Sequence, residues 1–249
     1  MKGKQVLLSE RLQALVDMVT PGNRVVDVGC DHGFVAIALV QQEISPHVLA
    51  MDVRKGPLAA AKEHIADWKL EEYIETRLSD GFLSYDRGEA DTAIIAGMGG
   101  KLMMRILQES RDKVEGLSEL ILQPQSELAA FRHYLSVEGY CILDENILLE
   151  DDKYYFLFRV TPPQTTCSYS DETDEQMDPE MAELYEKYGR LLLERKHPVL
   201  RQYLLRELGL AEEIRESLLD NPTQRARNRF IEVEKDIELI HRALGFYEL

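Results

Sequence analysis

The stretch VVDVGCDHG, from Val25 to Gly33, decides the fold. A β-branched run ends in glycine, and the apolar run Phe34 to Val40 comes after the second glycine, which predicts a strand, a tight turn and a helix. Compared with the G-x-G-x-x-G turn of dinucleotide-binding proteins, this turn keeps Gly29 and Gly33 but places Asp31 between them. A carboxylate there would repel a pyrophosphate and favour a ligand with a positively charged centre. A plain strand-turn-helix corner with an acidic helix cap is the alternative.

Two further acids lie at the ends of the next predicted strands. Asp52 ends the second strand within HVLAMDV, 19 positions after Gly33, where a carboxylate can accept hydrogen bonds from both hydroxyls of a ribose. Asp80 ends the run RLSD, where it can accept from an adenine amine while Gly81 leaves room for the ring. Either acid alone is explained equally well as a cap or turn residue. Together with the acid of the first loop, they indicate an adenosine-type ligand beyond the carboxyl ends of the strands.

Strand-like and helix-like segments alternate between residues 24 and 160, which predicts a parallel sheet wound with helices. The expected parallel strands are 24–28, 47–53, 74–78, 92–96 and 120–122. Residues 140–149 and 153–160 flank an acidic turn and predict an antiparallel hairpin at the sheet edge. We therefore expect an α/β, Rossmann-like domain over residues 1–160.

The composition changes after residue 160. Residues 161–180, TPPQTTCSYSDETDEQMDPE, are rich in proline, serine, threonine and acid, which predicts an acidic linker. Apolar residues then recur at intervals of three and four over 181–191 and 226–244, which predicts coiled-coil seams. Because Pro198 and Pro222 interrupt the helical pattern, we expect three helices in an all-α antiparallel coiled-coil domain over 181–249.

The composition excludes several classes of protein. Forty-five acidic against 29 basic residues give a net charge of -16, so a nucleic acid would have to be held by a local basic patch. Cys30, Cys141 and Cys167 form no C-x-x-C pair, and no H-E-x-x-H is present, so we expect neither a disulfide framework nor a metal site. The longest apolar run is too short to cross a membrane, and Glu10 and Arg11 stand where a signal peptide would be apolar. We expect a reduced, soluble, cytoplasmic protein.

Four motifs extend the pattern beyond single residues: LSERL at 8–12, VGCDHG at 28–33, IIAGMGG at 94–100 and LILQP at 120–124. With these motifs the sequence resembles the bacterial TrmK family, the tRNA (adenine-N1)-methyltransferases that act at adenine 22. The D-x-G opening at 27–29 is the form seen in class I S-adenosylmethionine-dependent methyltransferases. The family's order, a Rossmann-like domain and then a coiled coil, covers the whole chain. The family often has asparagine after the proline of LILQP, where this chain has Gln125.

The resemblance implies S-adenosylmethionine as the cofactor and tRNA as the partner, with no metal and no membrane. The residues expected to bind the cofactor are Arg11, Asp27, Gly29, Cys30, Gly33, Asp52, Val53, Asp80, Gly81 and Gly97. The residues expected in catalysis are Asp31, His32 and Met98. The residues expected to bind the substrate are Gly99, Gln123, Pro124, Gln125, Arg225, Arg227 and Arg229.

Methylation of adenine N1 needs no strong base, because this nitrogen has a free lone pair, so catalysis depends mainly on positioning. Asp31 either stabilises the cationic product or binds the methionine ammonium group. The glycines of 97–100 let the backbone approach a planar base, with Met98 as a soft apolar contact, or they form only a strand-to-helix turn. His32 either contacts the base or a phosphate or is a helix-start side chain.

Adenine N1 lies on the Watson-Crick edge, so a paired adenine must be unpaired or flipped. Arg225, Arg227 and Arg229 form a basic cluster that we expect to touch phosphates, with a solvated helix face as the alternative for each of them. Whether the helices bind RNA or pair with another subunit stays open, and a monomer is slightly favoured.

Three other functions fit parts of the sequence. A catalytically silent protein that binds S-adenosylmethionine and RNA would keep the same motifs. A methyltransferase with another RNA or a small-molecule acceptor would share the fold. A nicotinamide oxidoreductase is disfavoured by Asp31 and by the lack of a hydride-transfer constellation.

Overall fold

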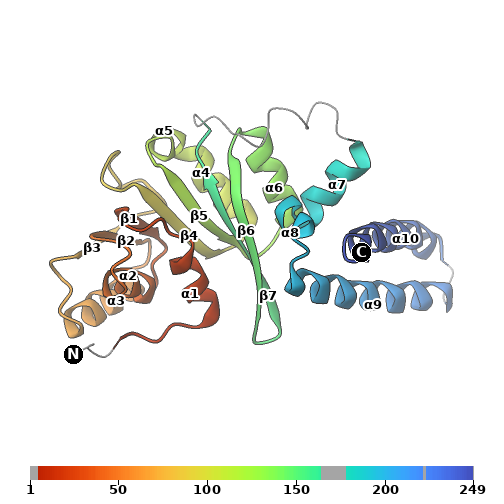
Figure 1. Ribbon diagram of the computed structural model, residues 1–249, viewed down its shortest axis with the longest axis horizontal. Coiled ribbons are helices and arrows are strands. Elements are labelled where there is room, and N and C mark those ends of the chain that lie inside the picture. Colours follow the sequence, from red (N-terminus) through yellow and green to blue (C-terminus); the bar gives the residue numbers. More distant parts are fainter. Residues whose placement is uncertain (1–4, 164–177, 221–222, 249) are drawn as a thin grey trace. The chain divides into compact units, whose positions relative to one another are not determined.

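The computed structural model describes residues 5–163, 178–220 and 223–248 (Figure 1). The chain divides into two compact units, Met1–Asp174 and Glu175–Leu249. Most of the predicted linker at 161–180, including Cys167, lies outside the described residues. Each unit is therefore a separate body, and the candidate site belongs to the first.

The first unit is built on a seven-stranded sheet of order β3-β2-β1-β4-β5-β7-β6. The strands are β1 (Val25–Val28), β2 (Val48–Asp52), β3 (Ile74–Leu78), β4 (Thr92–Met98), β5 (Glu119–Pro124), β6 (Cys141–Glu150) and β7 (Lys153–Thr161). The first five are parallel, and β7 pairs antiparallel with both β5 and β6. The predicted Rossmann-like sheet with an antiparallel edge hairpin is confirmed. The strand order reverses between β1 and β4, which is where such sheets bind ligands.

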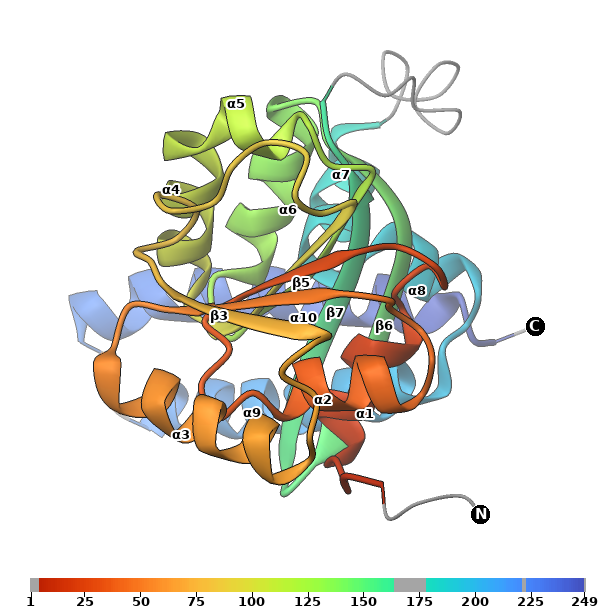
Figure 2. The ribbon, with the colours of Figure 1, turned by 90° about the vertical axis from the view of Figure 1, so that its left-hand side faces the viewer.

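Helices cover both faces of this sheet (Figure 2). One face carries α1 (Glu10–Asp17), α2 (Phe34–Gln41) and α3 (Lys55–Asp67). The other face carries α4 (Gly100–Glu109), α5 (Arg111–Val114) and α6 (Leu128–Val137). The helix α2 is apolar nearly all round because residues 35–39 are all buried in the core of its face. This rigid helix fixes the turn that precedes it.

The edge hairpin is tied to α6 by a buried ion pair. Arg132 Nε donates to Glu145 Oε1 at 2.8 Å, and both side chains are almost fully buried. The Arg132 guanidinium also lies over the rings of Phe156 and Phe158, at 5.4 and 5.0 Å from their centroids. A buried charge of this kind is costly to leave unpaired, so α6 and the hairpin are held in one arrangement.

The cysteines differ from the expectation in one respect. Cys30 is a buried free thiol, whereas Cys141, the first residue of β6, is disulfide-bonded. The expectation of fully reduced cysteines is therefore wrong at Cys141, because spacing along a chain does not decide which cysteines meet in the fold. In the part of the chain that the structure describes, no helix is long and apolar enough to cross a membrane.

The second unit is helical, as predicted. Its described helices are α7 (Pro179–Tyr188), α8 (Arg190–Glu194), α9 (Pro198–Asp220) and α10 (Gln224–Gly245). The expectation of three helices is wrong because Gly189, with φ of 91°, ends α7 and starts the short α8. The long helices α9 and α10 pack against each other, and the predicted seam positions Val233, Ile237 and Ile240 are buried. A regular coiled-coil packing stays a prediction.

Candidate active site

A cavity of about 590 Å³ lies beyond the carboxyl ends of β1, β2 and β4. Its wall is formed by α1, the turn after β1, the end of β2, the turn after β3 and the end of β4. This is the switch point of the sheet, and the volume is typical of a small-molecule site. In the described residues, no group of three histidines, cysteines or acids is placed to hold a metal ion.

The turn after β1 is sharp and depends on glycine. Gly29 has a φ of +85°, and a Cβ at this position would lie 2.5 Å from Cε of Met98. The amides of Gly29 and Cys30 donate to the carbonyl of Met51 at 2.8 and 2.9 Å, which holds the turn against β2. The Met98 side chain therefore packs against Gly29, where a side chain would collide with it.

Two carboxylates close the floor of the cavity. The side chains of Asp27 and Asp52 are almost fully buried, at 4% and 3% exposure. Asp52 accepts hydrogen bonds from the amides of Asp31 (3.2 Å) and Arg54 (2.8 Å), whereas Oδ2 of Asp27 has no hydrogen-bond partner among the described residues. Burial, together with the charges of Asp52 and Asp31, raises the pKa of Asp27 to about 7. An unpartnered buried oxygen in a cavity is suited to a ligand that donates a hydrogen bond.

A third carboxylate lies at the mouth. Asp31 is 58% exposed and has a φ of 49°, so its side chain turns outward from the sharp loop. Its Oδ1 lies 3.4 Å from Nη2 of Arg54, and its Oδ2 lies 3.8 Å from Nε2 of His32. Arg54 also lies 3.6 Å from Asp52. Arg54 was not among the residues expected from the sequence, although its place just after the ribose-type acid was a usable signal.

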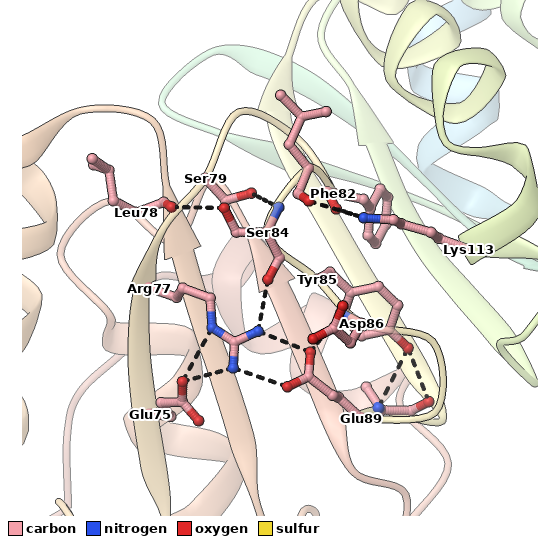
Figure 3. Close-up of polar contacts among 12 residues, drawn as sticks. Glu75, Arg77, Leu78, Ser79, Phe82, Ser84, Tyr85, Asp86, Glu89 and Lys113 are labelled. Atoms are coloured by element: carbon pink, nitrogen blue, oxygen red, sulfur yellow. Dashed lines mark hydrogen bonds and ion pairs between the residues drawn. The ribbon is translucent and has the colours of Figure 1, made fainter.

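The turn after β3 is held from below by a polar network (Figure 3). Arg77 donates to Glu75, to Glu89 and to the carbonyl of Ser84, at 2.7 to 3.1 Å. This guanidinium lowers the pKa of Glu89. From α5, Lys113 donates to two carbonyls of the same turn, those of residues 82 and 83. Asp80 and Gly81, which the same turn carries, therefore line the cavity in a fixed position.

The end of β4 is joined to α1 through the buried side-chain amide of Gln123. Oε1 of Gln123 accepts from the amide of Gly97 and from Nη1 of Arg11, both at 3.2 Å. Gln123 is fully buried and does not line the cavity, so its contacts in this structure are with the protein. The backbone amide of Gln125, just after β5, donates to the carbonyl of Met98 at 2.8 Å. Gln123 therefore positions both sides of the cavity, a role that was not expected from the sequence.

The structure brings most of the expected site residues together. The expected residues that line the cavity are Arg11, Asp27, Gly29, Cys30, Asp31, His32, Asp52, Val53, Asp80, Gly81, Gly97, Met98 and Gln125. The expected residues outside it are Gly33, Gly99, Gln123, Pro124, Arg225, Arg227 and Arg229. The need for glycine at position 33 comes from packing instead, because a Cβ there would lie 3.1 Å from Cβ of Ala61. The three arginines are exposed on α10, in the second unit.

Comparisons with known proteins agree with this geometry. The family model "Methyltransferase domain" matches residues 8–158. A Bacillus subtilis tRNA (adenine(22)-N(1))-methyltransferase is 36% identical over 151 residues, which are 61% of this chain and 63% of that protein. The sequence match thus spans less than two thirds of that relative.

Solved structures match over nearly the whole chain. The structure of B. subtilis M1A22 tRNA methyltransferase TrmK has a TM-score of 0.81 at 27% identity, covering 96% of this chain and 100% of that one. The structure of Streptococcus pneumoniae Sp1610, a putative tRNA (m1A22) methyltransferase, has a TM-score of 0.81 at 28% identity with the same coverage. The latter protein was also solved in complex with S-adenosyl-L-methionine, at a TM-score of 0.79, 28% identity and the same coverage.

The sheet, the acid-lined cavity at its switch point and the matching domain model define a class I S-adenosylmethionine-dependent methyltransferase. The chain belongs to the family that this methyltransferase domain model describes, and nearly its whole length is similar to the two tRNA (m1A22) methyltransferase structures.

The raised pKa of Asp27 predicts a pH-dependent stability. In the folded state the Asp27 carboxyl keeps its proton up to about pH 7, whereas an ordinary aspartate has a pKa of 3.8. The contribution of the protonated carboxyl to the free energy of unfolding is therefore complete below pH 3.8 and is lost as the pH rises through 7. Relative to Asp27→Asn, the wild type should lose on the order of 2–4 kcal/mol of unfolding free energy between pH 4 and 8. Urea unfolding of both proteins across this range measures the difference. Parallel profiles would show that Asp27 is not the titrating group.

Proposed function

We propose that the chain transfers the methyl group of S-adenosylmethionine to N1 of adenine 22 in tRNA. The observation that carries this proposal is the cavity at the switch point, which is lined by Asp27, Asp52 and Asp80 together with Gly97 and Met98. The resemblance of nearly the whole chain to tRNA (m1A22) methyltransferase structures supports the same reaction. A tRNA substrate would place the reaction in the cytoplasm.

The residues of the cavity fit the cofactor. Asp52 and Asp80 line the cavity, and in this proposal Asp52 accepts from the ribose hydroxyls and Asp80 from the adenine amine. The unpartnered oxygen of Asp27 can accept from the ammonium group, and Arg11 supplies a cation for the carboxylate. At Gly29 the backbone can approach the ligand closely. When bound, S-adenosylmethionine supplies an electrophilic methyl group on a sulfonium centre.

The chain's own residues mainly position the acceptor. Adenine N1 uses its own lone pair, so no residue has to remove a proton before the new bond forms. The loop at Gly97 and Met98, fixed through Gln123, offers a backbone edge and an apolar side chain to a planar base. The methylated ring becomes cationic, and the carboxylate of Asp31 at the cavity mouth can stabilise that charge.

The RNA must present an unpaired adenine to this cavity. Arg225, Arg227 and Arg229 lie on the first two turns of α10, and all three are exposed. Arg229 is paired with Glu232 at 2.7 Å. We assign phosphate contacts to this cluster, which would supply the positive patch that a chain of net charge -16 needs for RNA.

Methyl transfer to defined transcripts tests the reaction. Labelled methyl from S-adenosylmethionine should appear as N1-methyladenosine in a tRNA transcript with adenine at position 22 and not in the same transcript with guanine there. Asp31→Asn should lower kcat by about tenfold or more, because it removes the charge near the product, while the structure of the loop is kept. Equal labelling of both transcripts would refute the assigned target, and no labelling despite cofactor binding would favour a silent binding protein.

The arginine cluster is tested by salt dependence. Replacing Arg225, Arg227 and Arg229 together with glutamine should weaken tRNA binding about uniformly across tRNAs and reduce the slope of log affinity against log salt by roughly 2–3. Cofactor affinity should not change, since these residues lie in the second unit. An unchanged tRNA affinity and slope would remove the cluster from the RNA interface.

A further inference from the structure

Three aromatic rings, to which the methyl transfer proposed above assigns no role, lie close together beside the cavity. The rings of Phe34 and His64 are stacked, with centroids 4.7 Å apart and planes 20° from parallel. The ring of His32 lies 6.1 Å from that of Phe34, at 25°. The rings come from the turn after β1, the start of α2 and the last turn of α3, so segments distant in sequence build one aromatic group.

Hydrogen bonding and exposure show which of the three rings is accessible to a ligand. His64 Nδ1 donates to the backbone carbonyl of His32 at 3.0 Å, which fixes the His64 ring beside Phe34. The His32 side chain is 49% exposed, whereas Phe34 and His64 are half-buried. His32 and Phe34 line the cavity, and His64 does not. The His32 ring is therefore the member of the group that is most open to a ligand.

A cation lies next to this ring. The carboxylate of Asp31 approaches both His32 Nε2, at 3.8 Å, and Arg54 Nη2, at 3.4 Å, so the imidazole and the guanidinium flank one acid. The Arg54 side chain is 66% exposed. Proteins hold unpaired nucleotides, whatever their sequence, by stacking the base on an aromatic ring and pairing the phosphate backbone with a nearby arginine or lysine.

We propose that His32, Phe34, His64 and Arg54 form a docking surface for the unpaired nucleotide that flanks the methylated adenine. The base stacks on the His32 ring, and the phosphate lies at Arg54. A flipped adenine leaves its neighbour without a stacking partner, and this surface adjoins the cavity that would receive the adenine. This inference rests on the proposed RNA substrate.

Fluorescence of a base analogue tests the surface in the full-length enzyme. Two tRNA transcripts carry 2-aminopurine, one on each side of adenine 22, and stacking on a ring quenches this base. Wild type should quench one of the two. In His64→Ala, which leaves the cavity wall intact, the quenching should fall by at least half, and the KM for tRNA should rise about five- to tenfold.

Two further variants separate stacking from folding. His64→Phe keeps the ring and loses only the hydrogen bond to His32, so it should restore most of the quenching. His133→Ala removes an exposed histidine of α6, away from the cavity, and should behave as wild type. In all three variants, kcat and the affinity for S-adenosylmethionine should stay within about twofold of wild type.

The outcomes keep this inference apart from the proposed function. Methyl transfer by wild type, with unchanged quenching and KM in His64→Ala, would overturn the docking surface and leave the reaction standing. Absence of quenching by wild type in both transcripts would also overturn it. Quenching that depends on His64, without any methyl transfer by wild type, would support the docking surface and overturn the proposed function.

Discussion

The structure depends on the clustering of three carboxylates at one sharp turn. Asp27 and Asp52 are buried at the ends of adjacent parallel strands, and Asp31 stands in the turn above them. Burial and these like charges raise the pKa of Asp27 to about 7, and the cluster is tolerated only because the surrounding fold holds it. This costly cluster gives the protein a preformed cavity whose oxygens can accept hydrogen bonds and whose charge favours a cationic ligand.

The remaining elements keep that cavity in shape from a distance. Arg77 and Lys113 hold the turn that carries Asp80, and neither of them lines the cavity (Figure 3). Gln123 links the loop at Gly97 to Arg11 on α1 through one buried oxygen. The site is thus assembled from five segments whose positions are fixed by buried polar contacts, which is how a ligand site reaches the accuracy that positioning chemistry needs.

Features that depend on local pattern and parallel topology could be predicted from the sequence. Asp27, Asp52 and Asp80 could be expected to converge because the carboxyl ends of parallel strands meet at one edge of the sheet. The role of Gln123 and the stack of Phe34 on His64 could not be predicted, since each depends on contacts between distant segments. In the second unit, the break between α7 and α8 at Gly189 could not be predicted either, because the apolar heptad pattern runs through it without interruption.

Calorimetric titration of S-adenosylmethionine into wild type and Asp52→Ala tests most directly that this acid-lined cavity is the cofactor site. We predict one cofactor bound per chain, with affinity at least about tenfold weaker in Asp52→Ala, because this variant loses the buried carboxylate that we propose accepts from both ribose hydroxyls. Asp67→Ala, at an exposed end of α3, should bind as wild type does. Equal affinities in Asp52→Ala and wild type would contradict the assignment of this cavity to the cofactor.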